Sequence, residues 1–393
     1  MTRILVLTTT YPNNESDWTG AFIHSLVQAV RKRGFELEVL APSDGTYYGC
    51  RSLDGIPVHR FGYFLPHSLE RLTKGAGGIP ENIATSVLAR IQIIPMMAVF
   101  IMKTILAVRR SDLIYANWIG AGFVGAIASR FSGKPLVVSF RGDDGYLARD
   151  RPIWKLVTKW VIGQSSHVTA VSNELSDIMK DLGADTSRLS VPRFGVDSSL
   201  FFPGNKNPAE RFPVVMIFVG SLIPKKGLQD LIEALATPDL GDVRLVVVGD
   251  GYFASELKSL AQDKLQKDQV IWKGIAPPVE VAKLMRDADF LVLPSYTEGS
   301  PNVIKEAMAS ALPVIGTRVG GIPDLVTEGE TGLLYNPGDI ESLRQCIRIM
   351  LKNRGTRLKM GWSAKKKLDD SGLNWESTAR DFESIFLRAL QKT

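Results

Sequence analysis

The stretch Leu291-Val-Leu-Pro-Ser-Tyr-Thr-Glu-Gly-Ser-Pro-Asn-Val-Ile-Lys-Glu-Ala-Met308 decides how this chain is interpreted. The apolar run from Phe290 to Leu293 is short, branched and closed by Pro294, which predicts a buried strand. A helix is expected to begin at Ser300 or Pro301, because serine caps helices and proline fits the first helical position. Strand, loop and helix N-terminus together predict an α/β fold whose free backbone N–H groups form an anion site, suited to a phosphate or diphosphate.

Two carboxylates flank this expected anion site. Glu298 lies in the loop before the helix, and Glu306 lies inside the helix. Carboxylates beside a phosphate would repel it unless they face other groups. A sugar ring and a ribose are rich in hydroxyl donors, so the stretch predicts a site for a sugar nucleotide.

The surrounding sequence resembles the donor-site signature of retaining GT-B glycosyltransferases of family 4, the glycosyl transferases group 1. Glu298 and Glu306 are spaced as E-x7-E within E-G-S-P-N-V-I-K-E-A-M-A-S-A-L-P-V-I, which is followed by G-T-R-V-G-G-I-P-D-L-V. Two glutamates at this spacing are common, and a salt-bridging pair on a surface helix is the alternative. The Gly, Pro-Asn and Gly-Gly-Ile-Pro around them make the match specific. It is strongest over residues 213–335.

The resemblance implies a GT-B architecture, in which two Rossmann-like parallel-sheet domains face each other across a cleft. A chain of 393 residues is long enough for two domains. We expect an acceptor-side domain over 1–203, completed by a crossover helix at 375–393, and a donor domain over 204–374. Residues 203–211 have the composition of a linker.

A second motif, Gly220-Ser-Leu-Ile-Pro-Lys225-Lys226-Gly227, resembles the family form G-R-L-x-P-x-K-G, whose Arg and Lys grip the diphosphate. Lys226 matches the family lysine, whereas Ser221 replaces the arginine. Lys225 or Arg141 could supply the missing charge. An ordinary surface lysine is the alternative for Lys226.

A third motif is Ser139-Phe-Arg141-Gly-Asp143-Asp144, at the expected carboxyl end of a strand. The family often has His-Gly-x-Asp here, so Arg141 replaces a histidine that touches the donor sugar. Arginine is no base, but it binds phosphates or carboxylates with two parallel hydrogen bonds. Asp143 or Asp144 is expected to orient it, and a purely structural Arg–Asp pair is the alternative. Arg193-Phe-Gly-Val-Asp197 also departs from the family's Asn-Gly-Val-Asp.

The site residues implied by the resemblance fall into two groups. Glu298, Arg141 and Asp143 are the candidate catalytic residues, with Glu298 positioning the donor sugar. Glu306 would bind the ribose and Lys226 would neutralise the diphosphate. The donor-binding set is Gly20, Gly220, Ser221, Lys225, Lys226, Gly274, Glu298, Gly299, Ser300, Asn302, Val303 and Glu306.

The rest of the composition limits cofactors, partners and compartment. The net charge of +6 fits anionic substrates or an anionic membrane surface and is too small to indicate nucleic acid. Cys50 and Cys346 lie far apart, which favours a reducing cytoplasm. The four histidines form no ligand cluster, so no metal and no cofactor are expected beyond a nucleoside-diphosphate sugar.

Residues 91–110 form an apolar segment that ends in Arg109-Arg110. Gln92, Pro95 and Lys103 interrupt it, so we predict no transmembrane helix. A buried core helix and a helix at the surface of an anionic membrane remain as alternatives. Contact there would place the protein at the inner face of the cytoplasmic membrane.

A glycine motif supports a competing hypothesis. Gly120-Ala-Gly122-Phe-Val-Gly125 matches G-x-G-x-x-G after a strand, with Asp143 about twenty residues later, as in NAD-binding proteins. That fingerprint normally occupies the first strand–helix turn, which here lacks it, and close helix packing explains the glycines equally well.

The resulting prediction is a retaining enzyme of EC class 2.4 that transfers a sugar to a hydroxyl of a saccharide or lipid-linked acceptor, in cell-surface polysaccharide or glycolipid synthesis. The alternatives are an epimerase-like GT-B protein, an NAD-linked oxidoreductase and a sugar-nucleotide-binding protein without catalysis.

Overall fold

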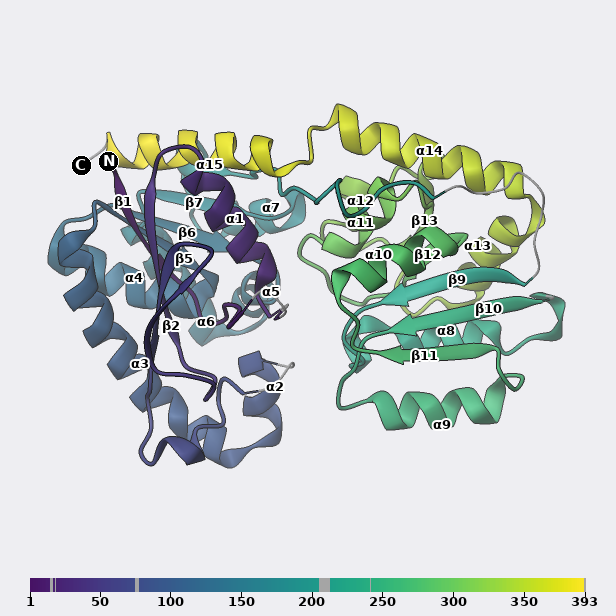
Figure 1. Cartoon of the computed structure of the whole chain (residues 1–393), viewed down its shortest axis with the longest axis horizontal. Helices are drawn as coiled ribbons and strands as arrows, with labels where there is room; N and C mark the ends of the chain where they lie inside the picture. The colour runs from purple at the N-terminus through teal and green to yellow at the C-terminus, as the bar shows by residue number, and fades with distance from the viewer. Residues whose placement is uncertain (15–16, 18, 75–77, 205–212, 241, 392–393) are drawn as a thin grey trace. The chain divides into compact units, whose positions relative to one another are not determined.

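The computed structural model describes residues 1–14, 17, 19–74, 78–204, 213–240 and 242–391. Contacts divide the chain into two units (Figure 1). Unit 1 comprises Met1–Arg193 and Trp375–Thr393, and unit 2 comprises Phe194–Asn374. The return to unit 1 at Trp375 is where the crossover helix was expected to begin, whereas the first boundary lies before residue 204. Most of the expected linker at 203–211 lies outside the described residues.

Unit 1 is built on an eight-stranded sheet of order β3-β4-β2-β1-β5-β6-β7-β8. All neighbouring strands pair in parallel except the β3–β4 hairpin. The strands are β1 Arg3–Leu7, β2 Glu36–Pro42, β3 Gly49–Leu53, β4 Ile56–Phe61, β5 Leu113–Asn117, β6 Leu136–Phe140, β7 His167–Ala170 and β8 Leu189–Ser190.

The helices of unit 1 connect most of these strands and cover the sheet. They are α1 Ala21–Arg31, α2 Gly78–Thr85, α3 Val87–Ala107, α4 Trp118–Ser132, α5 Asp143–Asp150, α6 Pro152–Gln164, α7 Asn173–Asp181 and α15 Trp375–Leu390, with short 3-10 turns at His67–Leu69, Val108–Arg110 and Thr186–Arg188. The final helix α15 lies along α1 (yellow and purple in Figure 1).

Aromatic rings join α15 to the sheet. Tyr115 on β5 lies 5.4 Å from the ring of Phe382 and 5.3 Å from that of Phe386, and Phe35 lies 6.0 Å from Phe386. Phe382 and Phe386 are almost fully buried. Burial of rings of this size makes α15 an integral part of unit 1.

Unit 2 is an all-parallel six-stranded sheet of order β11-β10-β9-β12-β13-β14. The strands are β9 Val214–Val219, β10 Val243–Val248, β11 Val270–Gly274, β12 Phe290–Leu293, β13 Val314–Thr317 and β14 Gly332–Tyr335. The helices are α8 Leu228–Leu235, α9 Ala254–Lys264, α10 Pro278–Asp287, α11 Asn302–Ala309, α12 Ile322–Leu325, α13 Ile340–Lys352 and α14 Arg354–Asp370, with 3-10 turns at Pro224–Lys226 and Pro238–Leu240.

The central strands of both sheets are buried on both faces, as expected for parallel sheets covered by helices. Strand β12, with the sequence Phe-Leu-Val-Leu, is fully buried, and so is β6. The strand order of unit 2 reverses between β9 and β12. Ligands of open α/β sheets bind at the carboxyl ends of strands at such a switch point.

Candidate active site

The N-terminus of α11 lies at this switch point of unit 2. The helix begins at Asn302, and Pro301 occupies the N-cap position without a side-chain cap. The expectation that Ser300 caps the helix and Pro301 lies inside it is therefore wrong by one residue, a usual uncertainty at helix ends. The N–H groups of Asn302 and Val303 have no partner within the helix, so they are available to an anion.

A tight backbone approach brings the β9–α8 loop against the end of β12. Gly227 has a φ of +71°, and a Cβ atom there would lie only 1.9 Å from the carbonyl oxygen of Pro294. The N–H of Tyr296 donates to the carbonyl of Lys225 (2.8 Å). Only glycine fits this position, which holds the two loops together.

This approach joins the lysine and the glutamate of the two motifs. The Nζ atom of Lys226 lies 2.6 Å from Oε1 of Glu298, and Ser295 Oγ donates to the same oxygen at 2.7 Å. Glu298 is 8% exposed, whereas the Lys226 side chain is 21% exposed. The carboxylate is thus held in one orientation, with a cation beside it that solvent reaches.

Glu306 lies inside α11 and is partly buried. Burial raises the pKa of its carboxyl to about 7, while the charge of Lys305 acts in the opposite direction. Lys305 itself is 1% exposed and donates to the carbonyl of Phe194 (3.2 Å). A partly buried carboxyl beside a helix N-terminus can accept hydrogen bonds from a diol once it is ionised.

The other donor-binding residues expected in unit 2 lie in the loops that follow β9, β11 and β12. Their backbone groups hold these loops together: Gly220 N–H donates to Val248, Gly274 accepts from Gly249 N–H, and Gly299 accepts from Gly321 N–H (3.0, 2.8 and 2.9 Å). Ser221 is exposed, whereas Lys225 and Ser300 are partly buried.

The remaining candidates, Gly20, Arg141 and Asp143, belong to unit 1. Arg141 follows β6, and its guanidinium donates to Asn117 Oδ1 (2.6 Å from Nη2) and to the hydroxyl of Tyr115 (3.0 Å). It also lies over the ring of Phe22, 5.1 Å from the centroid. Asn117 and Tyr115 of β5 therefore help to orient Arg141.

The two aspartates after Arg141 differ in role. Asp143 begins α5 and is exposed, whereas Asp144 is 6% exposed. Oδ1 of Asp144 accepts from the N–H groups of Arg141, Gly142 and Gly145 at 3.0, 2.9 and 3.1 Å. Burial raises the pKa of Asp144 to about 6 against these bonds. Asp144 is therefore the aspartate that shapes the backbone of this loop.

Gly20 precedes α1 with a φ of +74°, and a Cβ atom would lie 2.9 Å from the carbonyl oxygen of Thr10. The loop before it borders a cavity of about 240 Å³ at the carboxyl end of β1. Carboxylates and hydroxyls line this cavity, with one buried cation: Thr9, Thr10, Asp17, Thr19, Asp44, Thr73 and Arg60. Such groups suit a ligand rich in hydroxyls.

The sequence did not single out Asn117, Tyr115, Ser295 or Asp44. Asn117 and Ser295 come at or just after the carboxyl end of a strand, where ligand-binding residues of α/β proteins gather. That position is the signal that would have found them.

Gly120–Gly125 lies inside α4 rather than in a strand–helix turn. Cβ atoms on Gly122 and Gly125 would lie 3.1 Å from Val138 and 2.8 Å from Leu136, both on β6. These glycines allow α4 to pack closely on the sheet, so the structure does not favour the NAD-binding alternative.

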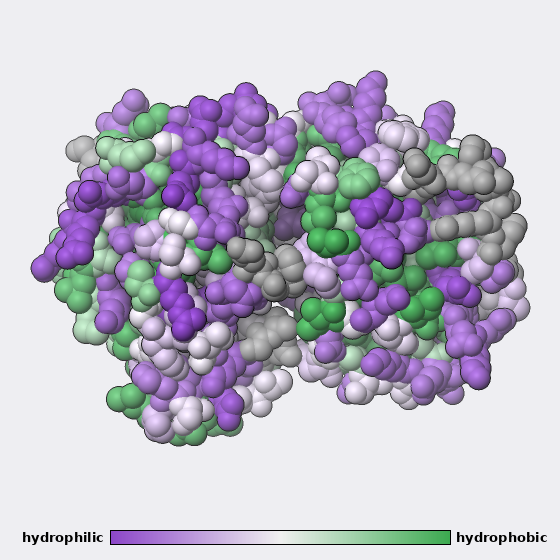
Figure 2. All heavy atoms as spheres, in the orientation of Figure 1, coloured by the Kyte–Doolittle hydropathy of each residue, from purple (hydrophilic) through white to green (hydrophobic). Residues whose placement is uncertain are grey.

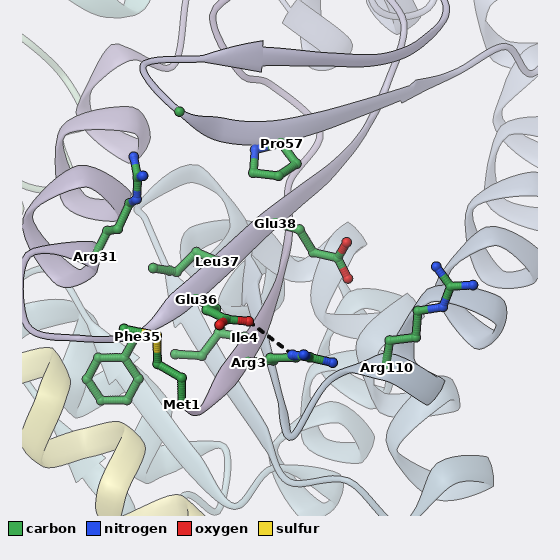
Figure 3. Close-up of a pocket in the computed structure, with 11 residues that line it drawn as sticks. Met1, Arg3, Ile4, Arg31, Phe35, Glu36, Leu37, Glu38, Pro57 and Arg110 are labelled. Carbon is green, nitrogen blue, oxygen red and sulfur yellow. Dashed lines mark hydrogen bonds and ion pairs between the residues drawn. The ribbon is translucent and has the colours of Figure 1, made fainter.

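A larger cavity of about 520 Å³ lies at the amino ends of strands β1 and β2, on the side of the unit 1 sheet opposite to the candidate site (Figure 3). Arg3 and Glu36, which form an ion pair of 3.0 Å, stand at the amino ends of β1 and β2 and line it together with Arg31 and Arg110. Since the motif residues follow the carboxyl ends, this cavity is separate from the candidate site. Within the described part of the chain, no group of three or more His, Cys, Asp or Glu could hold a metal ion.

Comparisons with known proteins agree with this geometry. A family model described as glycosyl transferases group 1 matches residues 204–367, and one described as a glycosyl transferase 4-like domain matches residues 19–195. The D-inositol 3-phosphate glycosyltransferase of Corynebacterium efficiens is 30% identical over 307 residues, which cover 71% of each chain. This chain belongs to the group 1 glycosyltransferases.

Other group 1 relatives match over different lengths. The D-inositol 3-phosphate glycosyltransferase of Corynebacterium glutamicum is 33% identical over 235 residues, 55% of this chain and 56% of that protein. The putative teichuronic acid biosynthesis glycosyltransferase TuaC of Bacillus subtilis is 29% identical over 375 residues, 88% of each chain.

Solved structures show that the glycosyltransferase has the GT-B fold. Sucrose-phosphate synthase of Thermosynechococcus elongatus superposes with a TM-score of 0.83 at 19% identity, covering 100% of both chains. HepE of Anabaena, crystallised with UDP-glucose, superposes with a TM-score of 0.73 at 21% identity, covering 98% of this chain and 99% of that one.

Proposed function

We propose that this group 1 glycosyltransferase transfers a sugar from a nucleoside-diphosphate sugar to a hydroxyl of a saccharide or lipid-linked acceptor, with retention at the anomeric carbon. The observation that carries the proposal is the Lys226–Glu298 contact of 2.6 Å beside the N-terminus of α11. It combines a cation and free N–H groups for a diphosphate with a carboxylate for sugar hydroxyls.

In the proposed complex each residue of unit 2 has a separate task. Lys226 and the N–H groups of Asn302 and Val303 bind the diphosphate, whose charge grows as the glycosidic bond breaks, so these donors stabilise the transition state. Glu298, held by Ser295, binds hydroxyls of the donor sugar. Glu306 accepts hydrogen bonds from the ribose. The departing diphosphate helps to deprotonate the acceptor, so the family's reaction requires no nucleophilic side chain.

The acceptor is proposed to bind unit 1. Arg141 lies at the carboxyl ends of its strands, and so does the small cavity lined by Asp17 and Asp44. TuaC is named for teichuronic acid synthesis, which supports a role in cell-surface polysaccharide or glycolipid synthesis. A lipid-linked acceptor would place the enzyme at the inner face of the cytoplasmic membrane.

Thermal stabilisation by UDP, GDP, ADP and NAD tests the donor site, since a ligand that binds only the folded state raises the midpoint. We expect one nucleoside diphosphate to stabilise the wild type and to lose its effect in Glu306→Ala. Stabilisation by NAD alone would overturn the proposal. With the matching donor, the anomeric configuration of the product, read by NMR, tests retention, and an inverted product would reject it.

A further inference from the structure

Helix α3 presents its apolar side chains outward. A stripe along its exposed side consists of Val87, Ile91, Ile94, Met102 and Leu106, with exposed fractions of 68%, 59%, 78%, 52% and 54%. Its inner side buries polar Gln92 and Thr104 completely. The inner side also packs Ala89, Met96 and Phe100 into the core, so the helix is apolar on both sides. A surface helix of a soluble domain has a polar outer side, so this stripe indicates an interaction surface.

Tertiary contacts fix α3 in this orientation. Gln92 Nε2 donates to the carbonyl of Leu69 (2.7 Å), and its Oε1 accepts from the N–H groups of Arg71 and Leu72 (2.9 and 3.2 Å). Within the described chain, Val87–Arg110 is the one segment long and apolar enough to cross a membrane, yet 28% of its most apolar window is buried in unit 1. The helix is thus held along the unit, with its inner side in the hydrophobic core and its outer side exposed.

The neighbouring helices extend the apolar surface. Helix α4 packs between α3 and α6, and Phe123 of α4 contacts Trp160 of α6 with ring centroids 5.3 Å apart. Outward side chains here are Phe131 (77% exposed), Ile153 (74%), Leu156 (69%), Trp154 and Trp160. In Figure 1, α3 lies along the outer side of unit 1. Figure 2, in the same orientation, shows hydrophobic residues on that side. We call the outward side of these three helices the α3–α4–α6 face.

The charges on the α3–α4–α6 face are all positive. None of the three helices contains Asp or Glu. The cations on them and on the turn after α3 are all exposed: Arg90, Lys103, Arg109, Arg110, Arg130, Lys155 and Lys159. A second copy of the chain docking here would bring two positive surfaces together, which opposes association. An anionic bilayer is complementary to both the charge and the apolar stripe.

A cavity beside the C-terminal end of α3 adds sites for anions. It measures about 800 Å³, and Lys103, Arg109 and Arg110 line it together with His59. Glu38 is the one carboxylate among its described lining residues. Lipid phosphates next to the stripe would find several cations here.

We propose that the α3–α4–α6 face docks side-on on the surface of an anionic lipid bilayer. The apolar stripe and the tryptophans enter the interfacial layer, while the lysines and arginines reach the headgroups. This proposal rests on the proposed function, because docking on the bilayer would bring the enzyme to its lipid-linked acceptor.

Vesicle flotation with the full chain tests the proposal, using phosphatidylcholine vesicles with and without phosphatidylglycerol at low and high salt. We expect binding to the vesicles with phosphatidylglycerol, weakened by salt. Ile94→Glu with Leu156→Glu places charges at two exposed positions, so folding should be unaffected and the bound fraction should fall about tenfold or more. Lys155→Glu with Lys159→Glu should reduce binding comparably. Leu387→Glu, 45% exposed on α15, is the matched control and should bind like the wild type.

Nucleoside-diphosphate stabilisation of the same variants separates the two proposals. It should be unchanged in each, because none of the substituted residues lies in unit 2. The docking proposal would be overturned if the wild type does not bind vesicles with phosphatidylglycerol, or if a double variant binds them as well as the wild type does. So would a wild-type dimer that Ile94→Glu with Leu156→Glu converts to monomer. Vesicle binding without stabilisation by any nucleoside diphosphate would instead refute the proposed function.

Discussion

Lys226 and Glu298 are 72 residues apart in the chain, yet their side chains meet at 2.6 Å. The pair lies where the loops after β9 and β12 touch, next to the N-terminus of α11. An ion pair at a ligand site shares its cation with the ligand, so Lys226 is expected to divide its positive charge between Glu298 and a bound diphosphate.

Replacing Lys226 with Met should weaken binding of the preferred nucleoside diphosphate by about tenfold to a hundredfold, because a charge-assisted hydrogen bond is lost and Glu298 gains an unbalanced negative charge. Isothermal titration of nucleoside diphosphate and of nucleoside measures the effect. Nucleoside binding should change little. Lys359→Met, exposed on α14 of the same unit, is the control; an equal loss there would mean that Lys226 has no special role.

Replacing Gly227 with Ala should destabilise unit 2 by about 2–4 kcal/mol, since the new methyl would overlap the carbonyl of Pro294 and the backbone is left-handed. Gly329→Ala is the matched control in the same unit: its φ of +73° is almost the same, but nothing lies within 4 Å of the added Cβ. Its cost should stay near 1 kcal/mol. Urea unfolding measures both, and equal costs would show that the contact with Pro294 is relieved easily.

The pKa of about 7 at Glu306 predicts two effects of pH. A ribose donates hydrogen bonds to the ionised carboxylate, so nucleoside affinity should rise between pH 6 and pH 8 in the wild type and stay flat in Glu306→Gln. Titration calorimetry across this range checks the first effect, and a parallel slope in both proteins would assign the titration to another group.

The second effect concerns stability without ligand. Burial in the folded protein raises the pKa of the Glu306 carboxyl from 4.5 to about 7. The protonated carboxyl therefore contributes to the stability of the fold fully below pH 4.5, and this contribution is lost as the pH rises through about 7. Glu306→Gln should therefore stabilise unit 2 at pH 8 by about 1–3 kcal/mol. Glu341→Gln is the control, because hydrogen bonds from Arg348 and Arg344 lower the pKa of Glu341, the opposite of the shift at Glu306. This substitution should not increase the stability of unit 2 at pH 8.

Replacing Arg141 with Met should lower transfer by about tenfold or more while nucleoside-diphosphate stabilisation stays unchanged, because Arg141 belongs to unit 1 and the diphosphate loops to unit 2. Tyr115→Phe removes one hydrogen bond to the guanidinium and should give a smaller loss in the same direction. Initial rates at varied acceptor concentration measure both. Loss of donor binding in Arg141→Met would instead assign this residue to the donor.

The sequence predicted the strands that carry the site because they are apolar runs closed by glycine or proline. Strand β12 has the predicted ends, Phe290 and Leu293, and helix α15 begins where it was predicted, at Trp375. The β3–β4 hairpin was not predicted, although Asp54-Gly55 is a common hairpin turn with positive φ at both residues. Strand β3 is exposed along most of its length, so it lacks the apolar pattern that reveals a strand.

Side-chain contacts between segments that are distant in the chain could not be predicted from the sequence. The sequence identified Lys226 and Glu298 separately, but their contact depends on the approach of Gly227 to Pro294, which only the packed loops define. Orientation of Arg141 by Asn117 likewise depends on the pairing of β5 with β6. The hydropathy of α3 left open which of its sides faces inward, and Gln92 decides this by binding the backbone at Leu69.

Helix α15 belongs to unit 1 but follows all of unit 2 in the chain. During synthesis, unit 2 leaves the ribosome complete, as one continuous segment, while unit 1 still lacks its last helix. Until then Phe35 and Tyr115 have no Phe382 and Phe386 to cover them. A released chain that ends before residue 375 should therefore expose apolar surface on unit 1 and bind chaperones through it, while its unit 2 is complete.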